Sequence, residues 1–301
     1  MGERPPRQQP KIMTAAGFGP KVMETRTEKL RREVPNFIRK NRRLLIRPAF
    51  WRILPRLVAA RQRKRSLSDD QVFRFIGTHH KVMTTYFTAV LRLLGYGLRL
   101  PYEKIYLDPP SASARLVLAM HSKLNLPQLV PYRGVHVMRD PRDMIVSGYH
   151  YHKWTHEAWT RRPDDNGISY QQKLNTTDKA SGLFLEIDHF IFFYRDLLED
   201  WDVSDPDTLE ISYDDLMGDD RHQRYVDIFS HLGLVDQDLD LAVDLMRLFE
   251  ASSRSGLKSG KVLENSHLRS GRSGQWKDEL NTDHVAYIEK ELGPVLRKFG
   301  Y

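Results

Sequence analysis

Short apolar runs alternate with helix-like patterns from about residue 72 to the end of the chain. Four runs have the length and the β-branched and aromatic content of buried strands: VFRFI (72–76), ARLVLAM (114–120), GVHVM (134–138) and TLEISY (208–213). Apolar residues at helical spacing follow the first run, and Gly95 is placed to end that helix. The alternation predicts an α/β fold with a central parallel sheet flanked by helices. Such sheets bind ligands at the carboxyl ends of their strands.

Charge divides the chain at about residue 65. Residues 1–65 hold 19 Lys and Arg against 4 Asp and Glu, a net +15, whereas residues 66–301 hold 28 against 35, a net −7. We therefore predict a basic N-terminal extension over 1–65, partly disordered and partly helical, and one domain over 66–301. Prolines 35, 48 and 55 are predicted to interrupt the helical pieces of the extension.

Residues 42–65 mix Leu, Ile, Phe and Trp with many cations, and two interpretations stay open. The segment lies on an anionic membrane surface as a peripheral contact, or its apolar residues pack on the domain while the cations stay in water. Cysteine is absent and no apolar run approaches the ~18 residues of a membrane span, so we expect a cytoplasmic protein, with membrane association left open by this segment. Nucleic-acid binding is not expected, because no zinc-finger spacing or RNA-binding signature accompanies the basic residues.

The first candidate site is the loop IGTHHKVMTTYF, residues 76–87, between a predicted strand and a predicted helix. A helix N-terminus presents unpaired N–H groups and a partial positive charge, so it can hold an anion. Lys81 adds a full charge, and Thr84 and Thr85 add hydroxyl donors. Charge-assisted hydrogen bonds contribute roughly 1.5–3 kcal/mol each, so two or three would decide the binding of a phosphate-like group.

The second candidate site is the segment GVHVMRDPRDMIVSGYHYH, residues 134–152. Asp140 is well placed as a helix N-cap, with Pro141 at the first helical position and Asp143 at the third. Arg139 therefore lies at the end of a strand, and Ser147 lies eight residues later on the following helix. The planar fork of an arginine matches phosphate oxygens, so this segment is a second phosphate-binding candidate.

Together the two segments resemble the PAPS-dependent sulfotransferases. The 5′-phosphosulfate loop of that family reads Pro-Lys-Ser-Gly-Thr-Thr-Trp, or His-His-Lys-x-Gly-Thr-Thr in more distant branches, against His-His-Lys-Val-Met-Thr-Thr-Tyr from residue 79 here. The resemblance covers about residues 72–301 and implies a three-layer P-loop-like fold. It also implies transfer of the sulfuryl group of 3′-phosphoadenylyl sulfate (PAPS) to an acceptor hydroxyl, which gives PAP and a sulfate ester without a metal. The acceptor is expected to be a small molecule or glycan with a carbohydrate, phenolic or lipid hydroxyl.

The resemblance assigns the nucleotide site residue by residue. Contacts to the 5′-phosphate and sulfuryl group fall on Lys81, Thr84 and Thr85, and aromatic contacts near adenine fall on Tyr86 and Tyr213. The 3′-phosphate falls to Arg139 and Ser147, and to a wrapping segment that comprises Arg269, Ser270 and Gly271. The sequence departs from the family pattern at three positions: Met83 takes the place of the usual Gly, Ser270 that of the usual Lys, and Gln275 that of the usual Asp.

Catalysis is assigned in the same way. His121 follows the strand predicted at 114–120, where the resemblance places the catalytic base, and an unperturbed imidazole pKa near ~6.5 suits that task. Lys81 is expected to stabilise charge on the leaving phosphate oxygen. Some branches use a Glu as base, so Glu186 and Asp188 stay as alternatives. Three histidines could suggest zinc, but no carboxylate or cysteine completes a ligand shell around them, and no metal is predicted: His150, His152 and His156.

Three points stay open. The polar stretch Trp154–Lys179 has a weak helical pattern and is a candidate acceptor-binding loop, in which Trp154 or Trp159 would stack on a sugar or arene. A metabolite kinase would use a similar fold, but the Gly-Lys-Ser/Thr spacing and a magnesium-ligand motif are missing. A sulfotransferase-like binding protein that has lost its chemistry is the remaining alternative. The sequence does not reveal the oligomeric state.

Overall fold

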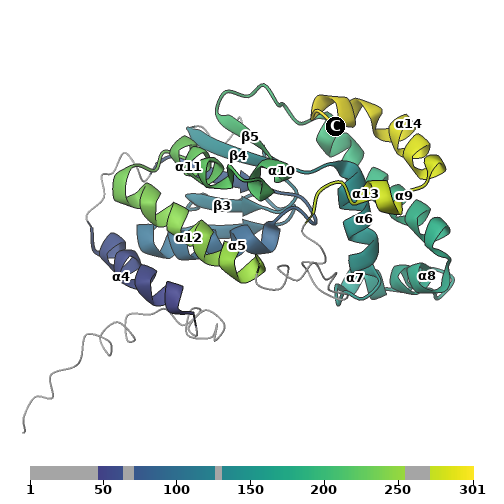
Figure 1. The fold of residues 1–301 in the computed structure, drawn as a ribbon, viewed down its shortest axis with the longest axis horizontal. Helices are drawn as coiled ribbons and strands as arrows, with labels where there is room; N and C mark the ends of the chain where they lie inside the picture. The colour runs from purple at the N-terminus through teal and green to yellow at the C-terminus, as the bar shows by residue number, and fades with distance from the viewer. Residues whose placement is uncertain (1–46, 64–70, 126–130, 255–271) are drawn as a thin grey trace, which may run out of the picture. The chain divides into compact units, whose positions relative to one another are not determined.

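The computed structural model describes residues 47–63, 71–125, 131–254 and 272–301 (Figure 1). Over these residues, five parallel strands form one sheet in the order β2-β3-β1-β4-β5. The strands are β1 (Phe73–Gly77), β2 (Tyr102–Ile105), β3 (Leu116–Ala119), β4 (Tyr132–Met138) and β5 (Thr208–Ser212). β1 and β3 are buried along their whole length, which explains why their sequences are continuous apolar runs. The predicted α/β fold with a parallel sheet is confirmed.

Two groups of helices flank the sheet (Figure 1). In the first group, α5 and α11 contact the strands and the members pack on one another: α4 (Pro48–Gln62), α5 (Thr84–Leu98), α11 (Arg221–His231) and α12 (Asp236–Arg254). The second group centres on α9 and has four main members: α6 (Pro141–His152), α8 (Tyr170–Thr176), α9 (Lys179–Glu199) and α14 (Thr282–Lys298). Three short helices complete the described elements: α7 (Ala158–Arg161), α10 (Tyr213–Met217) and α13 (Trp276–Glu279).

Helix α5 is longer than the sequence predicted. The helix continues to Leu98, and Arg99 in the left-handed conformation at φ 57° caps it, so the prediction that Gly95 ends the helix was wrong. Gly95 instead lies where the chain returns to form β2, since a Cβ there would sit 2.9 Å from Cβ of Tyr102 and 3.0 Å from the carbonyl oxygen of Leu100. The missing side chain serves close packing rather than helix termination.

Helix α4 lies within the basic N-terminal segment and is continuous, with Pro48 in its first turn and Pro55 inside it. Pro48 begins the helix after Arg47 in an extended conformation, which agrees with the predicted interruption there, but the prediction that Pro55 interrupts the helix was wrong. Pro35 lies outside the described residues. The apolar side of α4, which includes Phe50 and Leu57, is buried, and α4 packs on α5 and α12, so burial of this face outweighs the cost of an internal proline. Peripheral membrane contact through 42–65 stays a prediction, and so does the domain boundary at residue 65.

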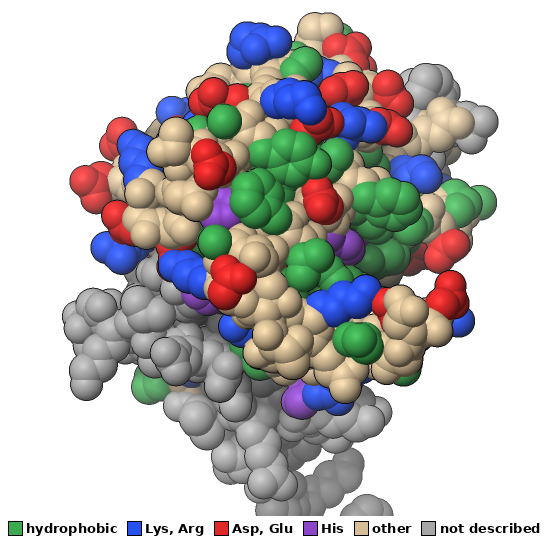
Figure 2. Space-filling view, turned by 90° about the vertical axis from the view of Figure 1, so that its right-hand side faces the viewer, with side chains coloured by type: hydrophobic (Ala, Val, Ile, Leu, Met, Phe, Trp, Pro, Cys, Tyr) green, Lys and Arg blue, Asp and Glu red, His purple; other side chains and the backbone are tan. Residues whose placement is uncertain are grey.

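The stretch 154–179 contains the two short helices α7 and α8. Ser169 and Gln172 form a reciprocal capping box at the start of α8, a local signal that the weak helical pattern had hidden. Figure 2 shows the side of the molecule to which α8, α9 and α14 belong, where hydrophobic side chains form several groups among acidic and basic ones. Each helix in the described part of the chain is too short or too polar to cross a membrane.

Candidate active site

The loop between β1 and α5 has a strained backbone at the residues that carry its chemistry. Lys81 and Met83 both have positive φ, at 65° and 53°, a region that costs residues with a Cβ roughly 1–2 kcal/mol. The hydroxyl of Thr84 donates to the carbonyl of His79 at 3.1 Å and lies 3.0 Å from the hydroxyl of Thr78. Met83 thus adopts the left-handed conformation that glycine favours, at the position where the resembled family has glycine.

The side chains of three other predicted nucleotide-binding residues of this loop have different environments: Lys81, Thr85 and Tyr86. The ammonium group of Lys81 lies 4.2 Å from the ring centroid of Tyr151, an aromatic cation contact that holds it beside the end of α6. Thr85 is exposed in the first turn of α5. The hydroxyl of Tyr86 donates to the carbonyl of Met246 at 2.5 Å, so this ring ties α5 to α12.

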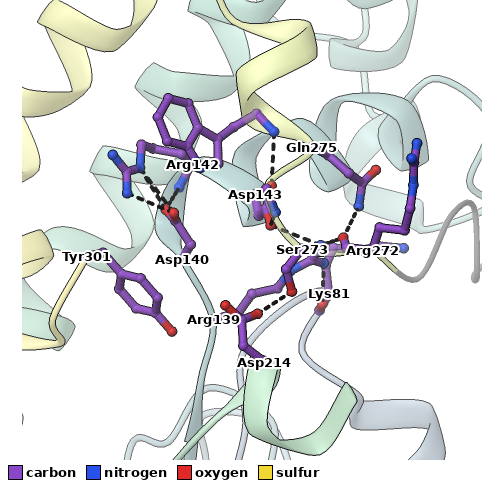
Figure 3. Close-up of polar contacts among 12 residues, drawn as sticks. Lys81, Arg139, Asp140, Arg142, Asp143, Asp214, Arg272, Ser273, Gln275 and Tyr301 are labelled. Carbon is purple, nitrogen blue, oxygen red and sulfur yellow. Dashed lines mark hydrogen bonds and ion pairs between the residues drawn. The ribbon is translucent and has the colours of Figure 1, made fainter. Parts of the chain in front are cut away.

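Arg139 brings the two predicted phosphate segments together. It lies between β4 and α6, where Asp140 caps the helix by accepting from the amide of Arg142 at 2.9 Å, as predicted. The guanidinium donates from Nη1 to the carbonyl of Lys81 at 3.3 Å and from Nη2 to the carbonyl of Arg272 at 3.2 Å (Figure 3). Three segments far apart in the sequence therefore meet at one buried cation.

Asp143 fastens the segment that follows the predicted wrapping residues. Its carboxylate accepts from the amides of Gly274 at 2.7 Å and Trp276 at 3.0 Å, and it lies 3.6 Å from Nη2 of Arg139 (Figure 3). Burial raises the pKa of Asp143, while Arg139 and the two amides oppose that rise. From the sequence, Asp143 was predicted only to lie in the first turn of a helix. Its contact with residues about 130 positions away could not be predicted, because no local pattern indicates it.

The remaining predicted nucleotide residues have mixed outcomes. Tyr213 begins α10, directly after β5, and its ring lies 4.4 Å from the guanidinium carbon of Arg139. Ser147 lies in the middle of α6 and is partly exposed. The wrapping residues lie outside the described residues, so their role stays a prediction: Arg269, Ser270 and Gly271.

A bound anion fits this region. Nε of Arg139 is buried and has no hydrogen-bond partner among the described residues, a costly state for a charged donor that an added acceptor would relieve. The other two nitrogens of this guanidinium donate to the backbone carbonyls of Lys81 and Arg272, so Nε is the nitrogen left for an added acceptor. The donors present are those that a phosphate prefers.

His121 is linked to the loop between β1 and α5 through the hydroxyl of Tyr194. It follows β3, its Nδ1 lies 2.9 Å from the hydroxyl of Tyr194, and the amide of His80 donates to the same hydroxyl at 3.0 Å. The ring of Tyr106 contacts His121 edge-on, with centroids 4.4 Å apart. Burial lowers the pKa of His121 to about 4, against a smaller upward effect of Glu157, so the imidazole is neutral at neutral pH.

The two carboxylates proposed as alternative bases differ in environment. Glu186 is buried, accepts from the hydroxyl of Tyr170 at 2.8 Å, and lies 2.9 Å from Nδ1 of His152. Asp188 is exposed and accepts from the hydroxyl of Tyr287 at 2.8 Å. Among the described residues no His, Asp and Glu side chains form a group of three that could hold a metal ion.

A buried pair of histidines joins the loop between β1 and α5 to strand β4. Nε2 of His79 lies 2.7 Å from Nε2 of His136, whose Nδ1 lies 2.7 Å from the Glu210 carboxylate. The indole of Trp201 donates to the other oxygen of Glu210 at 2.7 Å. Burial lowers the pKa of His79 well below its usual value. Sequence reasoning missed this network, whose only local signal is a histidine within the apolar run 134–138.

Comparisons with known proteins agree with the motifs. The family model of the sulfotransferase domain matches residues 69–300. No curated protein sequence matches this chain significantly. The chain is similar to mouse sulfotransferase SULT7A1 complexed with PAP, with 15% identity, a TM-score of 0.46, and coverage of 79% of this chain and 91% of that chain.

It is also similar to retinol dehydratase in complex with androsterone and inactive cofactor PAP, with 16% identity, a TM-score of 0.42, and coverage of 81% of this chain and 85% of that one. A complex of retinol dehydratase with retinol and PAP has the same identity and TM-score and is covered to 86%. The domain match spans most of the chain. The protein therefore belongs to the sulfotransferase domain family, the PAPS-dependent enzymes that its motifs resemble.

Proposed function

We propose that this protein transfers the sulfuryl group of PAPS to an acceptor hydroxyl at the site between the 78–84 loop, Arg139 and His121. The observation that carries the proposal is the hydrogen bond from Arg139 to the carbonyl of Lys81 at 3.3 Å, because it brings the two phosphate-binding segments to one place. A nucleotide with phosphates at both its 5′ and 3′ positions needs two such segments within the span of one molecule.

Each predicted residue has a role in this proposal. Lys81, Thr84 and Thr85 hold the 5′-phosphate and the sulfuryl group at the N-terminus of α5, where the helix dipole adds a favourable field. Lys81 stabilises charge on the leaving phosphate oxygen. The 3′-phosphate binds Arg139 and Ser147, together with Arg269, Ser270 and Gly271. Tyr86 and Tyr213 provide aromatic surface near adenine.

His121 is proposed as the catalytic imidazole on the acceptor side. Aromatic rings lie against it, with centroid distances of 4.4 Å to Tyr106 and 4.8 Å to Phe193. Exposed Trp159 lies in the predicted acceptor stretch. Flat aromatic surface suits the ring of a sugar or phenol or the chain of a lipid alcohol, so a small molecule or glycan with such a hydroxyl is the proposed acceptor class.

Two measurements test the function. Calorimetry with PAP should show binding that does not depend on magnesium, because the predicted phosphate contacts are cationic side chains and amides; binding that requires magnesium would instead favour a kinase. Radiolabelled PAPS with a panel of phenols, sugars and lipid alcohols should give a sulfated product. PAP binding without any product would favour a binding protein that has lost its chemistry.

A further inference from the structure

Neighbouring groups determine which ring nitrogen of His121 carries the proton. The amide of His80 can only donate, so the hydroxyl oxygen of Tyr194 accepts from it at 3.0 Å. This oxygen could accept a second hydrogen bond, but Nδ1 of His121, 2.9 Å away, is the one other partner of the hydroxyl among the described residues, so the hydroxyl proton is satisfied when Nδ1 accepts it. Neutral His121 therefore carries its own proton on Nε2. In this tautomer Nε2 can donate a hydrogen bond but has no lone pair with which to accept a proton.

His152 has the opposite tautomer. Its Nδ1 lies 2.9 Å from the Glu186 carboxylate, which can only accept when it is ionised, so Nδ1 carries the proton. The hydroxyl of Tyr170 donates to the same carboxylate oxygen at 2.8 Å and orients it further. Nε2 of His152 keeps its lone pair and has no hydrogen-bond partner within the described residues. A buried histidine oriented in this way by a carboxylate is the arrangement of many general bases.

His152 lies beside the phosphate loop. Its ring stacks on that of His80, with centroids 5.0 Å apart and planes inclined by 15°. The residue before it, Tyr151, holds the ammonium of Lys81 at 4.2 Å from its ring. His152 therefore contacts His80 directly, while its neighbour Tyr151 contacts Lys81. The histidine is connected in this way, through adjacent residues, to the proposed sulfuryl-binding cation.

We propose that His152, oriented by Glu186, is the general base of the sulfuryl transfer, and that His121 donates a hydrogen bond to the reacting oxygen atoms. This inference rests on the proposed function and assigns the path of the proton within it. The acceptor oxygen forms its bond to sulfur as the bond from sulfur to the 5′-phosphate oxygen of PAPS breaks, and the electron pair of that bond stays on the phosphate oxygen beside Lys81. The acceptor proton moves to Nε2 of His152, and the negative charge of Glu186 balances the imidazolium until its proton leaves to solvent.

An acceptor reaches His152 past Trp159. Nε2 of His152 is covered, as is Nε2 of His121, so in either case a side chain must move. The indole of Trp159 contacts the ring of His152 edge-on, with centroids 4.9 Å apart, and is 37% exposed on the four-residue helix α7. Because α7 is short and exposed, it is the element around His152 that moves at the least cost in free energy.

Histidine tautomers test the proposal without any acceptor. Long-range proton–nitrogen NMR of the full chain, with isotope-labelled histidine and bound PAP, reports which ring nitrogen carries the proton. His152→Gln and His121→Gln assign the two rings. The expected result is a proton on Nδ1 of His152 and on Nε2 of His121. A proton on Nε2 of His152, or on Nδ1 of His121, would overturn the proposal.

Turnover gives the second test, with radiolabelled PAPS and para-nitrophenol, glucose and a long-chain alcohol as probe acceptors, and with water as the acceptor in background hydrolysis. His152→Gln should lower kcat by about 100-fold or more, the usual worth of a general base, and should leave PAP affinity and the unfolding temperature unchanged. His150→Gln is the matched control, because His150 lies on the same helix and its Nε2 is 3.1 Å from the Glu279 carboxylate. Its turnover should not change.

The outcomes separate the two proposals. Turnover retained in His152→Gln and lost in His121→Gln would return the base to His121. A wild-type chain that binds PAP but neither sulfates any probe nor hydrolyses PAPS would contradict the proposed function. In that case the NMR tautomers would still show how the two histidines are arranged.

Discussion

Replacing Arg139 with alanine should weaken PAP binding while the sheet stays folded. The guanidinium has five N–H groups, and in the structure Nη1 and Nη2 each donate to one loop carbonyl at 3.3 and 3.2 Å. Nε has no partner among the described residues. A 3′-phosphate would therefore gain one charge-assisted hydrogen bond from this side chain.

The magnitude follows from that bond. A hydrogen bond to a charged group contributes about 1.5–3 kcal/mol, and each 1.4 kcal/mol corresponds to tenfold in Kd, so Arg139→Ala should raise the Kd for PAP by about 10–100-fold. A second effect follows from Asp143, since Arg139 opposes the rise in its pKa that burial causes. Without the guanidinium this pKa rises further, and the hold of Asp143 on the amides of Gly274 and Trp276 weakens.

Calorimetry with PAP measures the effect, with thermal unfolding as the check on folding. Arg139→Lys keeps the charge but not the planar fork and should give an intermediate Kd. Arg133→Ala is the matched control, because Arg133 lies on β4 near the opposite end of the strand and is exposed. An Arg139→Ala chain that is folded and binds PAP as tightly as the wild type would refute the reasoning.

Three further predictions concern folding. Met83→Gly should raise the free energy of unfolding by about 0.5–1 kcal/mol in denaturant titrations, because Met83 has φ 53° and glycine removes that strain at some cost in chain entropy. Gly148→Ala should lower it by about 1–3 kcal/mol, since the new Cβ would lie 2.4 Å from Oε1 of buried Glu186; unchanged stability would mean that this carboxylate is not where the structure has it. His121 has a folded-state pKa of about 4 against an ordinary value near ~6.5, so the unfolded chain binds more protons between these limits and stability should fall as pH falls through them. His121→Gln should flatten this part of a curve of unfolding temperature against pH, and an unaltered slope would argue against the low pKa.

The sequence predicts the parts of this molecule that short-range rules determine. The buried strands are continuous apolar runs, and the start of α6 is set by Asp140 and Pro141, so both could be read locally. The loop at Lys81 and the segment at Arg139 were likewise recognisable from residue types and spacing. Their meeting through one guanidinium is a result of the strand order, in which β4 lies next to β1.

Contacts between distant parts of the chain could not be predicted. The hydroxyl of Tyr194 bonds to groups 73 and 114 residues away, and Tyr194 itself lies in an apolar helical pattern that signals only packing. His152 and Glu186 are 34 residues apart, and their pairing depends on how α6 packs on α9. The amino-acid sequence does not indicate which tautomer a histidine adopts, because the tautomer depends on the groups that surround the ring in the folded protein.

A crystal structure of the full chain with PAP tests the central claim most directly. The account predicts one nucleotide whose 5′-phosphate contacts Lys81 and Thr84 while its 3′-phosphate contacts Arg139 and Ser147. A nucleotide bound elsewhere, or one that contacts only one of the two segments, would contradict it.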